Sequence, residues 1–262
     1  MAQSVTLSEP ILSVTSLEMR FGGIVALHGV SFAAAKGAIT AVIGPNGAGK
    51  TTLFNCITGM YRPTGGSVMF QGTDLTGAQP HTIARAGLVR TFQNLALFQG
   101  LSVLDNLLVG RYWHGRSGLL EGAFRSGRAR RDEREAQEKA AKVLAFLGLS
   151  DVATALPSEL AYGRQKQVEF GRALMQDAKI ILLDEPMAGM SRVEKAHMVE
   201  LIQRVREEFD LSFVIVEHDM PVVMEISDHI VVLDFGRKIA DGAPREVQED
   251  KAVIAAYLGA EV

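Results

Sequence analysis

The eight residues from Gly44 to Thr51, GPNGAGKT, match the pattern G-x-x-x-x-G-K-[ST] at every fixed position. The apolar run Ala38–Ile43 before them predicts a buried parallel strand, and Lys50–Met60 after them has helical spacing. A glycine-rich turn between a strand and a helix can point several backbone N–H groups at one anion, and the helix dipole adds to their attraction. The run therefore predicts a phosphate-binding loop inside an α/β fold.

Every residue of this loop is a candidate phosphate ligand: Gly44, Pro45, Asn46, Gly47, Ala48, Gly49, Lys50, Thr51 and Thr52. Lys50 supplies a positive charge for the β- and γ-phosphates of a nucleotide, and the Thr51 hydroxyl is a ligand for Mg²⁺. ATP with Mg²⁺ is therefore the expected ligand pair.

Two adjacent acids end a second apolar strand, in which Glu185 follows Ile180–Asp184. Neighbouring side chains of a strand point to opposite faces, so the two carboxylates should have different roles. We predict that Asp184 holds the Mg²⁺ shell and that Glu185 polarises the attacking water. Two acids at this place also describe a solvated strand end, but the phosphate loop favours the catalytic interpretation.

Alternating or continuous apolar runs predict five more strands, at Ile11–Phe21, Ile24–Ala34, Ser67–Phe70, Phe213–Glu217 and His229–Asp234. Strand patterns disappear between Leu95 and Arg172. There, Ala140, Val143, Leu144 and Leu147 have helical spacing. The chain is therefore expected to be an α/β nucleotide-binding core interrupted by a mostly helical insertion.

Five further segments resemble motifs of the ABC (ATP-binding cassette) ATPases, in that family's order and over nearly the whole chain. LAYGRQ at Leu160–Gln165, here called the signature segment, stands where the family has L-S-x-G-Q. Gln93 in RTFQN matches the family's Q-loop, and AGMS at Ala188–Ser191 matches its D-loop. His218, after FVIVE, matches its switch histidine. Phe21 stands where the family stacks an aromatic ring on adenine.

The resemblance implies a RecA-like P-loop NTPase core with an N-terminal antiparallel β subdomain and an α-helical subdomain inserted at about residues 95–172. The whole chain, residues 1–262, would form one such domain. Two chains would enclose two ATP molecules, each between one chain's phosphate loop and the other chain's signature segment.

The resemblance also implies roles for three single residues. Gln93 would touch Mg²⁺ or its water, His218 would bond the γ-phosphate and orient Glu185, and Phe21 would stack on adenine. Without the family's motif order, Gln93 would be an ordinary surface-loop residue and His218 a structural one. A core position remains the alternative for Phe21.

The signature segment departs from the family's usual form. Ala161 stands where a serine hydroxyl is common, Arg164 stands where glutamine is common, and Ser191 replaces an acidic or amide D-loop residue. The backbone amides of Tyr162 and Gly163 can still face a phosphate at a helix N-terminus. The alternative for Tyr162 is a packing residue at the start of the helix.

The phrases RTFQN, LAYGRQ, EHDM and AAYLG look like the larger of the two ATPase subunits of branched-chain amino acid importers. That resemblance implies a second ATPase subunit, identical or paralogous, integral-membrane permeases and, indirectly, a solute-binding protein. It also implies a cytoplasmic location at the inner face of the cell membrane. The alternatives are an importer of urea or small amides, a soluble ABC ATPase, and a nucleotide-dependent switch without useful turnover.

Composition limits the kinds of partner and the cellular compartment that are expected for this chain. With 27 basic and 30 acidic residues the chain has no overall basic field, so no nucleic-acid partner is expected. A single cysteine, Cys56, cannot form an internal disulfide, which suits a reducing compartment. No signal-peptide pattern is seen, and no run approaches the ~20 apolar residues that span a bilayer. The basic segment 114–134 is either a solvated loop or a contact with lipid headgroups or a membrane partner.

Overall fold

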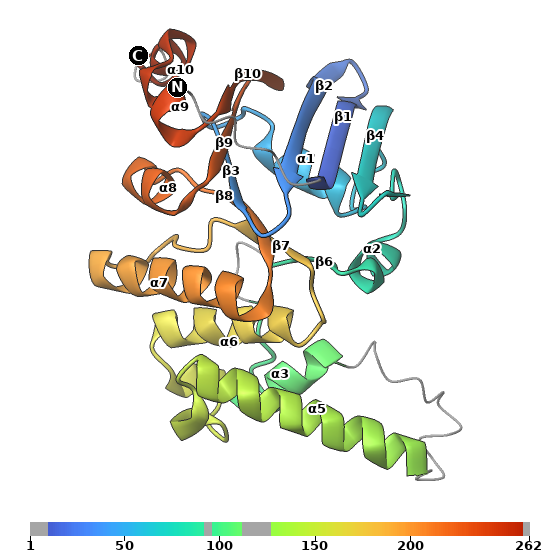
Figure 1. Cartoon of the computed structure of the whole chain (residues 1–262), viewed down its shortest axis with the longest axis vertical. Helices are drawn as coiled ribbons and strands as arrows, with labels where there is room; N and C mark the ends of the chain where they lie inside the picture. Colours follow the sequence, from blue (N-terminus) through green and yellow to red (C-terminus); the bar gives the residue numbers. More distant parts are fainter. Residues whose placement is uncertain (1–9, 92–95, 112–126, 259–262) are drawn as a thin grey trace, which may run out of the picture.

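A computed structural model describes residues 10–91, 96–111 and 127–258 of the chain. Its larger sheet has six strands in the order β10-β9-β3-β8-β7-β6 (Figure 1). The strands are β3 (Ile39–Ile43), β6 (Leu88–Arg90), β7 (Ile180–Asp184), β8 (Ser212–Val216), β9 (His229–Asp234) and β10 (Arg237–Gly242). β10 is antiparallel to β9, and the other neighbours are parallel.

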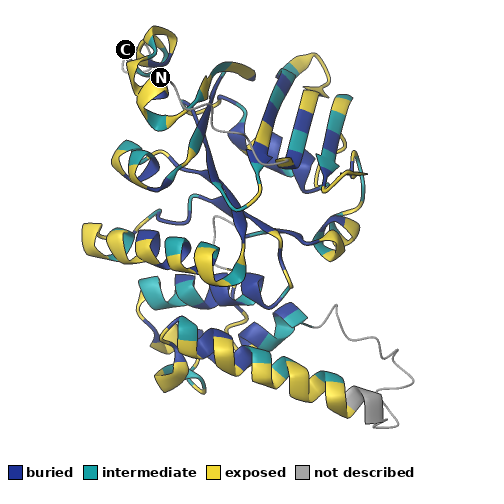
Figure 2. Ribbon diagram, in the orientation of Figure 1, coloured by how far each residue is buried: buried dark blue, intermediate teal, exposed yellow. Residues whose placement is uncertain are grey.

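The central strands β3, β7 and β8 are buried along their whole length because both faces of the sheet are covered. In β7, Ile181 and Leu183 pack against the helices on one face. Ile180 and Leu182 pack on the other face, against α1 (Lys50–Ile57) and the second sheet. Figure 2 shows these strands as a buried spine through the molecule. The carboxyl ends of the parallel strands therefore emerge from a rigid core.

The second sheet is antiparallel, in the order β2-β1-β4-β5. Its strands are β1 (Pro10–Phe21), β2 (Ile24–Ala35), β4 (Gly65–Phe70) and β5 (Thr73–Asp74). The Gly22–Gly23 turn joins the first two strands, and Phe21 pairs with Ile24 across it. This sheet is the expected N-terminal antiparallel subdomain, and it lies beside α1 in Figure 1.

The helices are α1, α2 (Pro80–Ala86), α3 (Val103–Arg111), α5 (Gly127–Phe146), α6 (Tyr162–Leu174), α7 (Arg192–Phe209), α8 (Met220–Ile226), α9 (Pro244–Glu249) and α10 (Lys251–Leu258). Short 3₁₀ turns cover Ser150–Val152 and Pro157–Glu159. α3, α5 and α6 form a helical layer at the end of the molecule away from the antiparallel sheet (Figure 1). The predicted fold class is confirmed, and the boundaries 95–172 for the helical subdomain stay a prediction.

Several predicted boundaries were wrong: β1, β2, β3, β4 and β8 differ from the predicted runs by one or two residues at one or both ends, and α1 ends early. The helix expected over Lys50–Met60 ends at Ile57, because Gly59 has φ 73° and a Cβ there would lie 2.2 Å from the Ala78 carbonyl oxygen. β8 begins and ends one residue before the expected Phe213–Glu217. The sequence also carried no prediction for β5, β6, β10 or α2.

Part of the basic segment 114–134 is helical rather than a loop. Residues 127–134 form the first turns of α5, where Arg130, Arg131 and Arg134 are exposed. The rest of the segment lies outside the described residues. In the described ranges, no helix is both long and apolar enough to cross a membrane.

Candidate active site

The phosphate loop, Gly44–Thr51, connects the end of β3 to the start of α1. Gly44 has φ 151°, and a Cβ there would lie 2.1 Å from the Leu233 carbonyl oxygen. Only glycine fits at such a backbone approach. The turn after β9 contacts the phosphate loop, since the Gly236 N–H donates to the Ala48 carbonyl oxygen at 3.0 Å.

The phosphate loop forms the floor of an open cleft of about 530 Å³, here called the phosphate-loop cleft. Seven of its lining residues were predicted to bind the nucleotide phosphates: Asn46, Gly47, Ala48, Gly49, Lys50, Thr51 and Thr52. Glu185 lines it as well, so the structure brings together the predicted loop and the predicted base. β2 and the β9–β10 turn add Ile24, Val25, Ala26, His28 and Phe235, which were not predicted.

The two adjacent acids at the carboxyl end of β7 have different surroundings. The Asp184 carboxylate is buried, and its Oδ2 accepts a hydrogen bond from Arg90 Nη2 at 2.6 Å. Glu185 turns out of the strand with φ 47°, and its N–H donates to the Val216 carbonyl oxygen at 2.9 Å. This left-handed backbone is uncommon for a residue with a side chain. The turn carries the Glu185 carboxylate into the phosphate-loop cleft while Asp184 stays in the sheet.

Arg90 is another site residue that the sequence analysis missed. It ends β6 and pairs with an acid 94 positions further along the chain. The only signal was its place in the RTFQN phrase, three residues before Gln93. Gln93 itself, the predicted Q-loop residue, lies outside the described residues.

His218 follows β8, and its imidazole is 63% exposed. The preceding Glu217 is buried, and its carboxylate accepts hydrogen bonds from the N–H groups of Met187, at 3.0 Å, and His218, at 3.1 Å. His218 is not among the residues that line the phosphate-loop cleft. The structure therefore places the predicted switch histidine outside the lining of the cleft, next to a buried carboxylate.

Phe21 also lies outside the lining of the cleft. Its ring is 43% exposed and meets Tyr61 edge to face, with centroids 5.2 Å apart. Phe235 lines the cleft and is 80% exposed. An aromatic ring at that turn could not be found from the sequence, because it depends on the close approach of the β9–β10 turn to the phosphate loop.

The signature segment lies on another element. Ala161 is the N-cap of α6, so the amides of Tyr162 and Gly163 stand in its first turn. None of these three residues lines the cleft of the same chain. The other departures have local partners: Arg164 forms an ion pair with Asp151, and the Ser191 hydroxyl caps α7. A signature segment on a separate helix is the arrangement expected of a site completed by a second chain.

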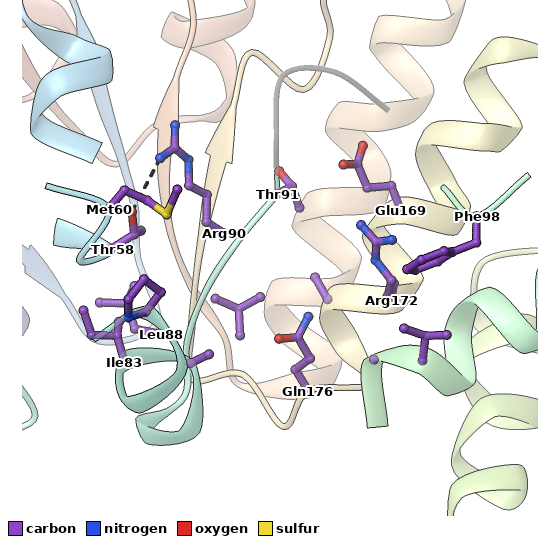
Figure 3. A pocket seen from close by; sticks show the side chains of 16 residues that line it. Thr58, Met60, Ile83, Leu88, Arg90, Thr91, Phe98, Glu169, Arg172 and Gln176 are labelled. Carbon is purple, nitrogen blue, oxygen red and sulfur yellow. Dashed lines mark hydrogen bonds between the residues drawn. The ribbon is translucent and has the colours of Figure 1, made fainter. Parts of the chain in front are cut away.

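A second cavity, of about 330 Å³, lies between the nucleotide-binding core and the helical layer (Figure 3). We call it the subdomain groove. One wall, from the segment that follows α1 and from α2 and β6, carries Thr58, Met60, Ile83, Leu88 and Arg90. The opposite wall, on the helical side, carries Phe98, Glu169, Arg172 and Gln176. Glu169 is buried, whereas Phe98 is 51% exposed. A groove that offers an exposed aromatic ring, a methionine and arginines has the residue types that are enriched in protein-binding surfaces.

Comparisons with known proteins point to one family. A model of the ABC transporter family matches residues 27–188, and one of the branched-chain amino acid ATP-binding cassette transporter family matches residues 237–262. The chain is 45% identical over 253 residues, 97% of its length and 99% of the relative's, to the high-affinity branched-chain amino acid transport ATP-binding protein BraF of Pseudomonas aeruginosa.

Two solved structures extend the likeness to the fold. The ADP conformation of an ATP-binding cassette of an ABC transporter aligns with a TM-score of 0.85 and 36% identity, over 96% of this chain and 100% of that one. A dimeric post-hydrolysis state of another ATP-binding cassette, bound to ADP and Pi, aligns with a TM-score of 0.73 and 25% identity. That alignment covers 89% of this chain and 99% of the other.

Proposed function

Because this chain belongs to the ABC transporter family of ATP-binding cassettes, we propose that it is the subunit that energises an importer of branched-chain amino acids. Its activity is ATP hydrolysis coupled to transport. The observation that carries the proposal is the joint lining of one cleft by the phosphate loop and Glu185. Support for the amino-acid substrate comes from BraF and from the family match at residues 237–262.

The amides of the phosphate loop and Lys50 would bind the ATP phosphates, with Mg²⁺ held by the Thr51 hydroxyl and Asp184. Proteins hold Mg²⁺ through one or two carboxylates together with substrate phosphates and waters, and this donor set fits that chemistry. Among the described residues, no cluster of three or more His, Cys, Asp or Glu side chains offers a separate cage. When bound, Mg²⁺ neutralises charge on the β- and γ-phosphates.

In the hydrolytic step, Glu185 would accept a proton from the water that attacks the γ-phosphate in line. His218 would orient Glu185 and bond the γ-phosphate, and Gln93 would contact Mg²⁺ or its water. The exposed phenyl ring of Phe21, at the end of β1, is available to stack on adenine. Lys50 and the phosphate-loop amides would stabilise the charge that develops on the transferred group.

A second ATPase subunit, identical or paralogous, would complete each site. Ala161, Tyr162 and Gly163 lie away from their own chain's cleft, which supports contact with the phosphate bound by a partner. The dimeric cassette bound to ADP and Pi adds a precedent for such pairing. ATP would thus favour a closed dimer that hydrolysis releases.

The subdomain groove is the surface that we assign to the membrane permease. Its exposed aromatic, Phe98, and its apolar lining residues Met60 and Ile83 suit the apolar face of an amphipathic helix from that partner. Because the groove separates the nucleotide core from the helical layer, a helix seated there would move with both. A solute-binding protein would take part only indirectly, and the chain would work at the cytoplasmic face of the membrane.

The test is ATP-dependent uptake of labelled leucine by vesicles that contain this chain, its permeases and the solute-binding protein. We expect uptake with the parent chain and none with Glu185→Gln. Uptake of labelled urea without uptake of leucine would contradict the amino-acid assignment. Failure of the chain to co-purify with permeases from membranes would contradict the transporter role.

A further inference from the structure

Arg90 joins three elements of the active site through one buried guanidinium. Nη2 donates to Asp184 Oδ2 on β7, and Nη1 donates to Asn55 Oδ1 on α1, both at 2.6 Å. The guanidinium carbon also lies 5.5 Å from the centre of the Phe54 ring. The side chains of Arg90 and Asp184 are only 9% and 7% exposed. Arg90 therefore ties the helix after the phosphate loop to the strand that carries the metal carboxylate.

Stabilisation of the fold does not by itself account for a buried ion pair such as Arg90–Asp184. Taking two charges out of water offsets much of their attraction, so such pairs are weak evidence for stabilisation. A guanidinium differs from other cations in its rigid fork, which fixes the orientation of each group it bonds. Here one branch of the fork holds Asp184 and the other holds Asn55. The bond to Oδ2 fixes the plane of the Asp184 carboxylate, and with it the direction of Oδ1.

We infer that Arg90 is a positioning residue for the Mg²⁺ site. It holds Asp184 in the orientation that a bound metal requires, and it ties β7 to α1. This inference rests on the proposed function and deepens it. The same side chain stands in the wall of the subdomain groove (Figure 3). A partner that occupies the groove would therefore contact Arg90, which itself bonds the Asp184 carboxylate.

A competing interpretation gives the opposite sign. If the Arg90 guanidinium only occupied the place of a cation beside Asp184, Mg²⁺ would have to displace it, and removal of Arg90 would tighten metal binding. A positioning role requires weaker metal binding after its removal, because loss of a residue that orients a metal ligand typically costs 10- to 100-fold in metal affinity.

The experiment measures ATP affinity by fluorescence titration of the full chain, once with Mg²⁺ and once with EDTA. All proteins carry Glu185→Gln so that ATP is not consumed. By linkage, the ratio of the two affinities reports how strongly the metal binds in the ATP complex. We expect Arg90→Met to lower this ratio by about tenfold or more. The matched control is Arg85→Met, an exposed arginine on α2, which should leave the ratio unchanged.

The outcomes separate the inference from the proposed function. A parent that binds no ATP sinks the proposed function itself. Suppose instead that the parent binds ATP in a metal-dependent way and that the affinity ratio of Arg90→Met equals or exceeds the affinity ratio of the parent. That result overturns the role of Arg90 and leaves the proposed function standing. A purely structural role would lower the unfolding temperature and leave the ratio intact. If Arg90→Met does not fold, Arg90→Lys carries the test, because it keeps the charge without the fork; an undiminished ratio there also overturns the inference.

Discussion

The ammonium of Lys50 and the carbonyl oxygen of Gly44 form a hydrogen bond of 2.6 Å across the phosphate loop. Lys50 also donates to the Pro45 carbonyl oxygen at 2.9 Å. Burial lowers the pKa of Lys50, and the nearby carboxylates of Glu185 and Asp184 oppose that shift. The loop thus holds the cation with its own backbone, at the place where it would meet a phosphate.

Replacement of this cation should weaken ATP binding and hydrolysis together. Hydrogen bonds to charged groups contribute roughly 1.5–3 kcal/mol each, so Lys50→Ala should lower ATP affinity about 10- to 150-fold. Titration with a fluorescent ATP analogue and a phosphate-release assay measure the two effects. Lys36→Ala is the matched control, because Lys36 is exposed and pairs only with the exposed Asp210 in the described structure. Unchanged affinity in Lys50→Ala would refute the phosphate-loop assignment.

Loss of the carboxylate at Glu185 should separate binding from turnover. Glu185→Gln keeps the shape of the side chain but removes the proton acceptor, so turnover should fall at least ~10²-fold while ATP still binds. Size-exclusion chromatography with ATP should then show a trapped dimer. Turnover within twofold of the parent would remove Glu185 from the mechanism.

Ala161→Ser should strengthen the signature segment. Serine is a better N-cap than alanine, by roughly 0.5–2 kcal/mol, and Ala161 is the exposed N-cap of α6. A serine hydroxyl there can also donate to a phosphate on the opposing subunit, which should preserve or raise ATP-driven dimerisation. The measurements are dimer formation and single-turnover hydrolysis with the partner ATPase. A severe fall in both would show that this position does not face a phosphate.

Phe98→Ala should uncouple transport from hydrolysis. Its exposed ring lines the subdomain groove and no part of the phosphate-loop cleft, so the isolated chain should hydrolyse ATP within about twofold of the parent. Truncation of a buried interface aromatic typically costs ~2 kcal/mol or more, so permease binding should fall by at least about tenfold. Val193→Ala, at an exposed position on α7, is the control. Undiminished permease binding would disprove the groove assignment.

Cys56 should resist alkylation in the folded protein. Burial raises the pKa of this thiol to about 11, and the thiolate is the reactive form. At pH 8 about one thiol in a thousand would be ionised, so iodoacetamide should label the native chain far more slowly than the urea-unfolded chain. Because the folded pKa is raised, its contribution to stability is complete below about pH 9 and is lost as pH rises towards 11. Equal labelling rates would contradict the burial.

The most predictable parts of the molecule were those whose signal is local. β7 and β9 were predicted with their observed ends, because strands covered on both faces are unbroken apolar runs. β10 was missed, because RKIADG is largely polar and lies at the sheet edge. The three residues of β6 are too few to show any period. The early end of α1 depends on the contact of Gly59 with a distant carbonyl group, which no periodicity reveals.

The same distinction applies to the site. The phosphate loop and the paired acids are contiguous motifs, so the sequence contains their whole signal. Arg90 acts on a carboxylate 94 residues away, and Phe235 enters the cleft only because two turns pack together. The departure at Arg164 likewise finds its explanation in the ion pair with Asp151, which belongs to tertiary structure.

The buried carboxylate of Glu217 accepts hydrogen bonds from the backbone N–H groups of both Met187 and His218, and it restrains the backbone at His218. In the role proposed for it, His218 would approach a γ-phosphate by rotation about its side-chain bonds. Exposed side chains exchange rotamers in picoseconds to nanoseconds, whereas enzymes of this kind turn over at about 1–10³ s⁻¹. In the proposed cycle, reorientation of the exposed imidazole is therefore too fast to limit turnover.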